Sequence, residues 1–200
     1  MRVKAHWFRD ESAKAPGEVA GAVAFIAFRV AHNTLKSMRK AQFDIDAGPQ
    51  YFEFLAEALA FAIQCACRIA WPRFDEAGRM AFATALGQRA ADHLAGNQSE
   101  LLGLQPAAEI RAAFIERLNR RFAEYADFGY DAQGPDFAFH RYFASLIAEL
   151  VPEKDRHWTH DQVIAIEGPE AAATMAKSLE SLLDTGPARK PRRRAASVGE

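Results

Sequence analysis

Cysteine is scarce in this chain, and the two copies present do not form a metal or redox motif. Cys65 and Cys67 are the only cysteines, and a single alanine separates them within the apolar stretch FAIQCACRIAW. Side chains two positions apart on a helix point about 200° away from each other, so they can neither chelate one metal nor form a disulfide. Their spacing also differs from the CxxC of zinc and thioredoxin-like sites. We therefore interpret both as reduced, small hydrophobic residues that flank a polar stripe.

Long hydrophobic runs are also missing. The longest uninterrupted apolar run, Val19 to Phe28, covers ten residues, whereas a helix that crosses a bilayer needs roughly 20. Asp10 and Glu11 precede this run, and acidic residues at that place are untypical of a signal peptide. We therefore expect no membrane association and a cytoplasmic location.

Recognisable catalytic motifs are absent as well. The chain has no Gly-x-Ser-x-Gly elbow, no phosphate-binding glycine loop, no dinucleotide fingerprint and no His-Glu-x-x-His. No histidine follows a glutamate by three residues, which excludes the ligand pattern of ferritin-like di-iron bundles. Because helical proteins can build sites from scattered residues, these absences lower the expectation of an enzyme without removing it. No motif indicates a cofactor.

Positive charge is concentrated at one end of the chain. Five basic residues and Glu200 give residues 185–200 a charge of +4, so that the first 184 residues carry −5 within a total of −1. An acidic body gives no electrostatic reason to bind nucleic acid, and only the tail offers a weak one. The tail also lacks interleaved aromatic residues on which bases could stack.

Helical periodicity, in contrast, is abundant. Half of the residues are hydrophobic, and they recur three and four positions apart rather than alternating as in strands. Proline, aspartate and glycine mark the ends of the segments. Four helices are predicted with both ends: Pro16 to about Lys40, Pro49 to Trp71, Pro106 to a C′ residue at Gly129, and Gly134-Pro135 to Pro152. Two more are predicted to start at Asp75 and at Pro169. A capping box at Thr159–Gln162 predicts a further helix start, and VIAIEG after it is helical or extended.

These segments predict an all-α fold, an antiparallel bundle of six to seven helices with short connections. Residues 1–184 form a single helical domain, of which 1–15 are an N-terminal segment. Residues 185–200 have no apolar pattern and are expected to be a disordered basic tail.

A polar stripe follows the helix that contains the cysteines. Glu53, Glu57, Gln64 and Arg68 project from one side of it, opposite a wide apolar face. Two glutamates on one face could be paired carboxylates for acid–base or metal chemistry. The ordinary role of such a stripe is to face water, and this is our expectation.

Two groups of acids and histidines are the weak candidates for chemistry. Glu153, His157, His160 and Asp161 could bind a divalent metal if they met on one helix face. The predicted cap at Thr159 would place His157 before that helix, which favours a polar connection instead. Asp136 and His140, four residues apart, are the candidate catalytic pair, although this spacing more often marks a local surface pair.

The least expected feature is on the first predicted helix. Phe25 shares the side of the helix that carries cationic residues, and Gly21 and Phe28 lie close to it. Such a patch needs a cover, supplied either by Trp7 and Phe8 of the N-terminal segment or by another subunit. We therefore expect a protein-association module, with a homodimer slightly favoured. The alternatives are a metal-dependent enzyme or metal-binding protein using the Glu153–Asp161 cluster, and a bundle that binds an apolar small ligand.

Overall fold

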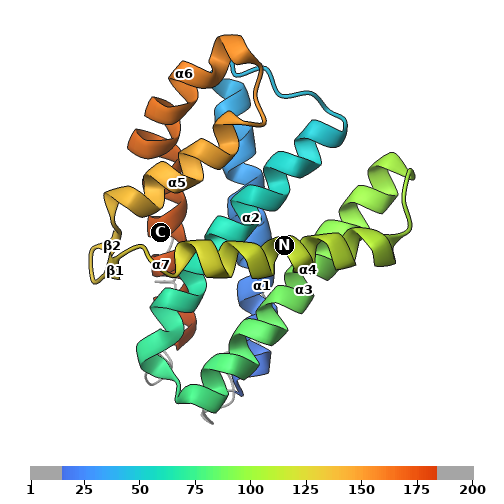
Figure 1. The fold of residues 1–200 in the computed structure, drawn as a ribbon. Coiled ribbons are helices and arrows are strands. Elements are labelled where there is room, and N and C mark those ends of the chain that lie inside the picture. Colours follow the sequence, from blue (N-terminus) through green and yellow to red (C-terminus); the bar gives the residue numbers. More distant parts are fainter. Residues whose placement is uncertain (1–14, 184–200) are drawn as a thin grey trace, which may run out of the picture.

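The computed structural model describes residues 15–183, which fold into an all-α bundle and confirm the predicted fold class (Figure 1). Trp7, Phe8 and the basic tail lie outside the described residues. The helices are α1 (Pro16–Lys40), α2 (Pro49–Ala70), α3 (Glu76–Leu102), α4 (Ala107–Tyr125), α5 (Phe137–Ala148), α6 (Glu153–Gln162) and α7 (Gly168–Leu183). A 3₁₀ turn, η2 (Trp71–Arg73), follows α2, and a π-helical turn, η3 (Val163–Glu167), joins α6 to α7. Strands β1 (Tyr130–Asp131) and β2 (Gly134–Pro135) form a short antiparallel hairpin.

The core is centred on α2. Nearly every residue of this helix from Phe52 to Ala66 is buried, because α1, α3, α4, α5 and α7 all contact it. In Figure 1, α4 crosses the middle of the molecule in front of α2, and α1 lies behind. The segment Pro49–Arg73 is long and apolar enough to span a membrane, but 78% of its most apolar window is buried inside the bundle. A buried core helix of a soluble protein has the same composition.

The predicted start of the third helix is confirmed, and the predicted end of the fourth is wrong. Asp75 caps α3, because its carboxylate accepts a hydrogen bond of 2.8 Å from the Gly78 amide. The helix ends at Gly103, whose φ of 60° is readily adopted by glycine. The prediction that Gly129 is the C′ residue of α4 is wrong, since the helix already ends at Tyr125. The Arg68 side chain of α2 binds carbonyl oxygens at that end, so that α4 stops without a glycine.

The prediction that the fifth helix begins at Gly134-Pro135 is also wrong. These residues form β2, where Gly134 has a φ of 110° that suits glycine alone, and Pro135 pairs with Tyr130. The helix α5 begins at Phe137 instead, because Asp136 caps it by accepting a 2.7 Å hydrogen bond from the Phe139 amide. A carboxylate satisfies a free amide at a helix start, which proline cannot do.

The predicted capping box at Thr159 is wrong as well. The helix α6 begins at Glu153 after Pro152, and Thr159 is buried in its interior. The Thr159 hydroxyl donates to the Asp155 carbonyl oxygen at 2.9 Å, one turn earlier, so that it caps nothing. The VIAIEG segment, which the sequence left open, is helical and contains the π-helical turn η3.

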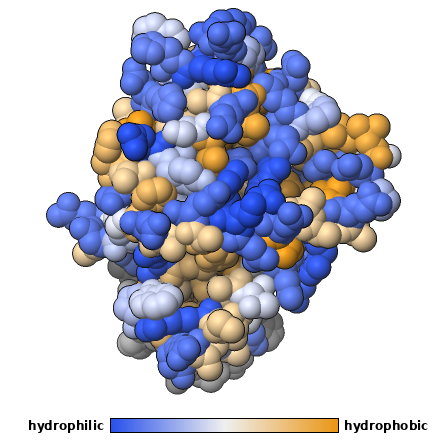
Figure 2. Space-filling view, in the orientation of Figure 1, coloured by the Kyte–Doolittle hydropathy of each residue, from blue (hydrophilic) through white to orange (hydrophobic). Residues whose placement is uncertain are grey.

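The outer surface in this view is largely hydrophilic (Figure 2). Apolar residues gather at its right side, where α3 and α4 meet in Figure 1. Leu101 and Leu104 of that turn are 63% and 72% exposed. The turn between α3 and α4 is therefore an apolar tip. The pocket described below lies elsewhere, at the C-terminal ends of α2 and α4.

A candidate ligand-binding pocket

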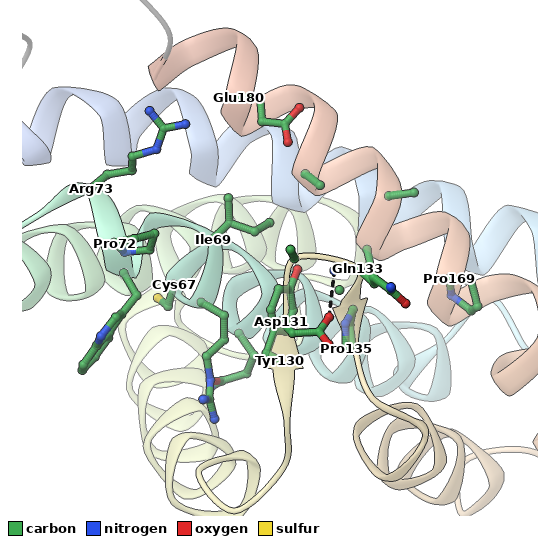
Figure 3. A pocket seen from close by; sticks show the side chains of 18 of the residues that line it. Cys67, Ile69, Pro72, Arg73, Tyr130, Asp131, Gln133, Pro135, Pro169 and Glu180 are labelled. Atoms are coloured by element: carbon green, nitrogen blue, oxygen red, sulfur yellow. Dashed lines mark hydrogen bonds between the residues drawn. The ribbon is translucent and has the colours of Figure 1, made fainter.

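A pocket of about 1130 Å³ opens between the C-terminal half of α2, the end of α4, the β1–β2 hairpin and α7 (Figure 3). Small-molecule sites usually have volumes of about 300–1,000 Å³, so this space is sufficient for an organic ligand. Figure 3 shows Cys67 and Ile69 on the α2 side, Tyr130 and Pro135 on the hairpin, and Glu180 on α7 above them. Four separate segments of the chain therefore meet around one space.

Much of the pocket wall is apolar. It includes Ile69 of α2, Phe122 of α4, Tyr130 of the hairpin, and Ala172, Ala173 and Ala176 of α7. The alanines recur along α7 because helical residues three and four apart share a face. Their small side chains leave the space that the larger side chains of α2 and the hairpin do not fill.

Gln64 is the buried polar group of this wall. This residue is only 3% exposed, and its amide nitrogen Nε2 has no hydrogen-bond partner among residues 15–183. An unsatisfied buried donor of this kind costs about 1–3 kcal/mol of stability. The prediction that Gln64 faces water is wrong, because α4, α7 and the hairpin surround this side of α2.

Arg68 lies one turn after Gln64 and lines the same pocket. Its Nη2 donates to the carbonyl oxygens of Tyr125, Ala126 and Phe128 at 2.9, 3.2 and 3.4 Å. These carbonyls belong to the C-terminal end of α4, where the helix dipole attracts a cation. The guanidinium is therefore held in place at the pocket wall by the end of another helix.

Asp136 and His140, the candidate catalytic pair, have two different roles in the structure. Both carboxylate oxygens of Asp136 accept backbone hydrogen bonds, from Phe139 at 2.7 Å and Gly129 at 2.8 Å. These bonds lower the pKa of Asp136, the bond from Phe139 contributing most. His140 instead lines the pocket, and its Nδ1 is buried without a hydrogen-bond partner. Burial lowers its pKa, which keeps the imidazole neutral at pH 7.

Gly168, at the start of α7, makes room for the His140 ring. A Cβ atom at position 168 would lie 2.5 Å from His140 Nδ1 and 3.0 Å from the Val163 carbonyl oxygen. Only glycine therefore fits between the ring and the π-helical turn η3. The sequence contained no sign of this contact, because positions 140 and 168 lie in different helices.

The candidate metal ligands lie on α6, away from this pocket. Because α6 begins at Glu153, His157 and His160 are on one continuous helix, with His157 exposed and His160 half-buried. His160 borders a separate hollow of about 240 Å³ beside Phe128 and Tyr142. Within residues 15–183, no three His, Cys, Asp or Glu side chains are arranged to hold a metal ion. The set Glu153, His157, His160 and Asp161 is therefore not brought together as a ligand group.

Both cysteines are free, in agreement with the prediction that they are not bridged. Cys65 is fully buried and shares a hydrogen bond with Tyr130, whereas Cys67 is half-buried and lines the pocket. The prediction that Cys65 lies at a boundary is wrong, because the hairpin covers it. Burial raises the pKa of the Cys67 thiol to about 12, while Arg68 lowers it to a smaller extent.

The prediction that Glu57 faces water is wrong. Glu57 is 5% exposed, because α4 packs on this side of α2 and supplies Arg117 and Arg121 one turn apart. Glu53 is exposed as expected, and it pairs with Arg117 at 2.5 Å. This part of the polar stripe joins two helices and leaves no carboxylate pair available for acid–base work.

The candidate association surface on α1 is partly covered by α3. The Phe25 and Phe28 rings lie 6.1 Å and 5.8 Å from the His93 ring, measured between centroids. Phe25 nevertheless stays 37% exposed, and a Cβ atom at Gly21 would meet nothing within 4 Å. The sequence had allowed two covers, the N-terminal segment or another subunit, and α3 is a third.

Sequence reasoning found none of the pocket residues as a group. The one available signal is that Gln64 and Arg68 interrupt the apolar second half of α2 at the spacing of one helical turn. Comparisons of this chain with protein-family models, with curated proteins and with solved structures gave no match.

Proposed function

We propose that this protein binds a small organic molecule in the pocket between α2, α4, the hairpin and α7. The observation that carries the proposal is the unpartnered amide of Gln64 in the wall of a pocket of about 1130 Å³. Buried polar groups are nearly always hydrogen-bonded, and an exception needs an explanation. A ligand that presents a hydrogen-bond acceptor to Gln64 supplies one, and the apolar wall accommodates its hydrocarbon part.

We propose binding rather than catalysis at this site. The thiol of Cys67 is the nucleophile nearest to the pocket, and burial raises its pKa to about 12, so that little thiolate exists at neutral pH. The side chains of His140 and Asp136, the candidate acid–base pair, share no hydrogen bond among the described contacts, because the Asp136 carboxylate caps α5 and accepts from the Gly129 amide.

The test uses the neutral fluorescent dye Nile red, whose emission rises in an apolar site. We expect saturable binding of one dye per chain to the wild type. Ala173→Trp fills the pocket from α7 and should abolish this binding, whereas Thr174→Trp, on the next and equally exposed position, faces away and should retain it. Equal binding by the two tryptophan variants would show that the dye binds elsewhere.

A second candidate function is self-association through α1, which the exposure of Phe25 favours. Gly21 and Ala22, one turn earlier, present small side chains that allow a second copy of α1 to approach, and a two-fold dimer is the commonest closed arrangement. Phe25→Glu should then weaken association in light scattering over a concentration series. Met80→Glu is the matched control, since Met80 is exposed on α3. A wild type that is monomeric at every concentration excludes this function.

We also propose a cytoplasmic location. The burial of the most apolar helix inside the bundle supports it, since no apolar segment among residues 15–183 is left for a bilayer. Fractionation of cells that express the chain tests the proposal, and recovery in the membrane fraction after a salt wash would contradict it.

A further inference from the structure

We infer that the ligand of this pocket is an amphipathic monocarboxylate whose carboxylate binds Gln64 and Arg68. This inference rests on the proposed function and specifies its ligand. Gln64 and Arg68 are four residues apart on α2, so that their side chains project from the same face, and both line the pocket. An amide nitrogen and a guanidinium are both hydrogen-bond donors, and a carboxylate accepts from both.

The first argument is the unused donor capacity of Arg68. A guanidinium has five N–H donors. In Arg68, only Nη2 donates to protein groups among residues 15–183, and its three acceptors are all backbone carbonyl oxygens of the α4 end. Its Nε and Nη1 groups are free to bind an acceptor from the pocket.

The second argument is the missing counterion. No aspartate or glutamate between residues 15 and 183 lies within ion-pair distance of Arg68, although the side chain is half-buried. Two arginines of α4 that are also partly buried differ, since Arg117 and Arg121 both pair with Glu57. A partly buried cation is stabilised by an opposite charge, and the negative end of the α4 dipole compensates the charge of Arg68 only in part. A carboxylate in the pocket provides the full charge.

The other residues of the pocket wall indicate what the rest of the ligand is. Ile69, Phe122 and the α7 alanines offer contacts to a hydrocarbon chain or ring system. Asp131 and Glu180 also line the pocket and are exposed, so that they repel a second anionic group near the opening. Arg68 and Arg73 are the arginines of the lining, and Asp131 and Glu180 are its acids, so that the described wall has no excess of positive charge for a dicarboxylate or a phosphate.

The experiment measures affinities for two matched pairs of probes, dodecanoate with dodecanol and naphthoate with naphthamide, by displacement of Nile red and by calorimetry. We expect the carboxylate of at least one pair to bind the wild type about tenfold or more tightly than its neutral partner, as for a hydrogen bond to a charged group. Gln64→Leu should weaken carboxylate binding about tenfold and the binding of the neutral partners less, because a hydrogen bond to a charged group is stronger than one to a neutral group. Gln88→Leu, at an exposed position on α3, should change neither.

Weaker carboxylate binding by Gln64→Leu can be distinguished from a loss of folding. Leucine removes an unpartnered buried donor, so that Gln64→Leu should keep or raise the melting temperature. If both members of each pair bind equally, or if Gln64→Leu leaves the preference unchanged, the carboxylate inference is wrong while the proposed function stands. If Nile red and all four probes fail to bind the wild type, the proposed function is wrong, and the inference fails with it.

Discussion

Arg121 of α4 holds the buried carboxylate of Glu57 of α2 with two parallel hydrogen bonds, from Nε to Oε2 at 2.8 Å and from Nη2 to Oε1 at 2.7 Å. The same guanidinium binds Glu124, which in turn accepts a 2.6 Å hydrogen bond from the Tyr142 hydroxyl of α5. These contacts join α2, α4 and α5. They also satisfy charged groups that would otherwise be costly to bury.

Removing Glu57 should therefore destabilise the fold strongly. Glu57→Leu leaves Arg121 and Arg117 without their shared carboxylate, and breaking a buried pair in this way costs about 3 kcal/mol or more. Urea denaturation of the variant measures the loss in the free energy of unfolding. The double variant with Arg121→Met should recover part of it, because Arg121 then no longer has to stay mostly buried with only the more exposed Glu124 as its partner.

The matched control is the exposed pair of Glu116 and Arg120 on the outer side of α4. Glu116→Leu should cost no more than about 1 kcal/mol, because water already screens this pair. Similar losses for Glu57→Leu and Glu116→Leu would contradict the structural role of the buried pair.

Gly168→Ala should destabilise the protein and disturb the pocket. The new Cβ would lie 2.5 Å from His140 Nδ1 and 3.0 Å from a backbone oxygen, and overpacking of this kind costs about 1–3 kcal/mol. Gly17→Ala in α1 has open space around its Cβ and should be neutral or stabilising by up to about 1 kcal/mol. Thermal unfolding of the two variants measures this difference in sign. Two equal shifts would show that His140 does not press on Gly168.

Glu167→Gln should stabilise the protein at neutral pH. Glu167 is 2% exposed, and burial raises the pKa of its carboxyl, while hydrogen bonds from Gln162 and Ser37 and the charge of Glu170 modify the shift. A raised folded-state pKa means that this group contributes stability below the unfolded pKa of about 4.3 and loses that contribution as the pH rises through the folded pKa. Glutamine does not ionise, so that the variant does not lose stability at this position as the pH rises.

The gain from Glu167→Gln should therefore be largest at pH 7 and disappear near pH 4. Denaturation curves at several pH values test this dependence, with Glu149→Gln, at the exposed position that directly follows α5, as the control. A gain that does not change with pH would show that the carboxyl of Glu167 is not the cause.

Cys67 should report occupancy of the pocket. Its pKa of about 12 and that of Cys65, which burial also raises, predict slow reaction of the native protein with a disulfide reagent at pH 8. In Cys65→Ala the remaining Cys67 should react faster than Cys65 does in Cys67→Ala, because only Cys67 lines the pocket. A bound carboxylate should slow Cys67 alone. Fewer than two free thiols in the denatured, unreduced wild type would contradict the absence of an internal disulfide.

The local chemistry of the chain was sufficient to predict the helices of the bundle. Pro16 and Pro49 begin α1 and α2 as expected, and Asp75 caps α3, because these signals act within a few residues. Leu86, Phe114 and Met175, which recur at the helical spacing of apolar residues, are buried for the same reason. The errors at Gly129, Gly134 and Thr159 have separate causes. Arg68 of α2, distant in sequence, binds the carbonyl oxygens where α4 ends, whereas Asp136 caps α5 locally and α6 already begins at Glu153.

The candidate site was decided by tertiary structure. Whether Glu57, Gln64 and Arg68 face water depends on which helix packs against them, and one helix seen alone cannot indicate this. In the part of the chain that the structure describes, α4 brings arginines to Glu57 but only backbone carbonyls to Arg68, while the amide nitrogen of Gln64 has no acceptor. The stripe of polar residues on α2 therefore forms a buried ion pair at one end, whereas at the other end it lines a pocket with incompletely hydrogen-bonded donors. The physical reason is that burial removes water, so that each polar group can bind only the partners that neighbouring segments supply.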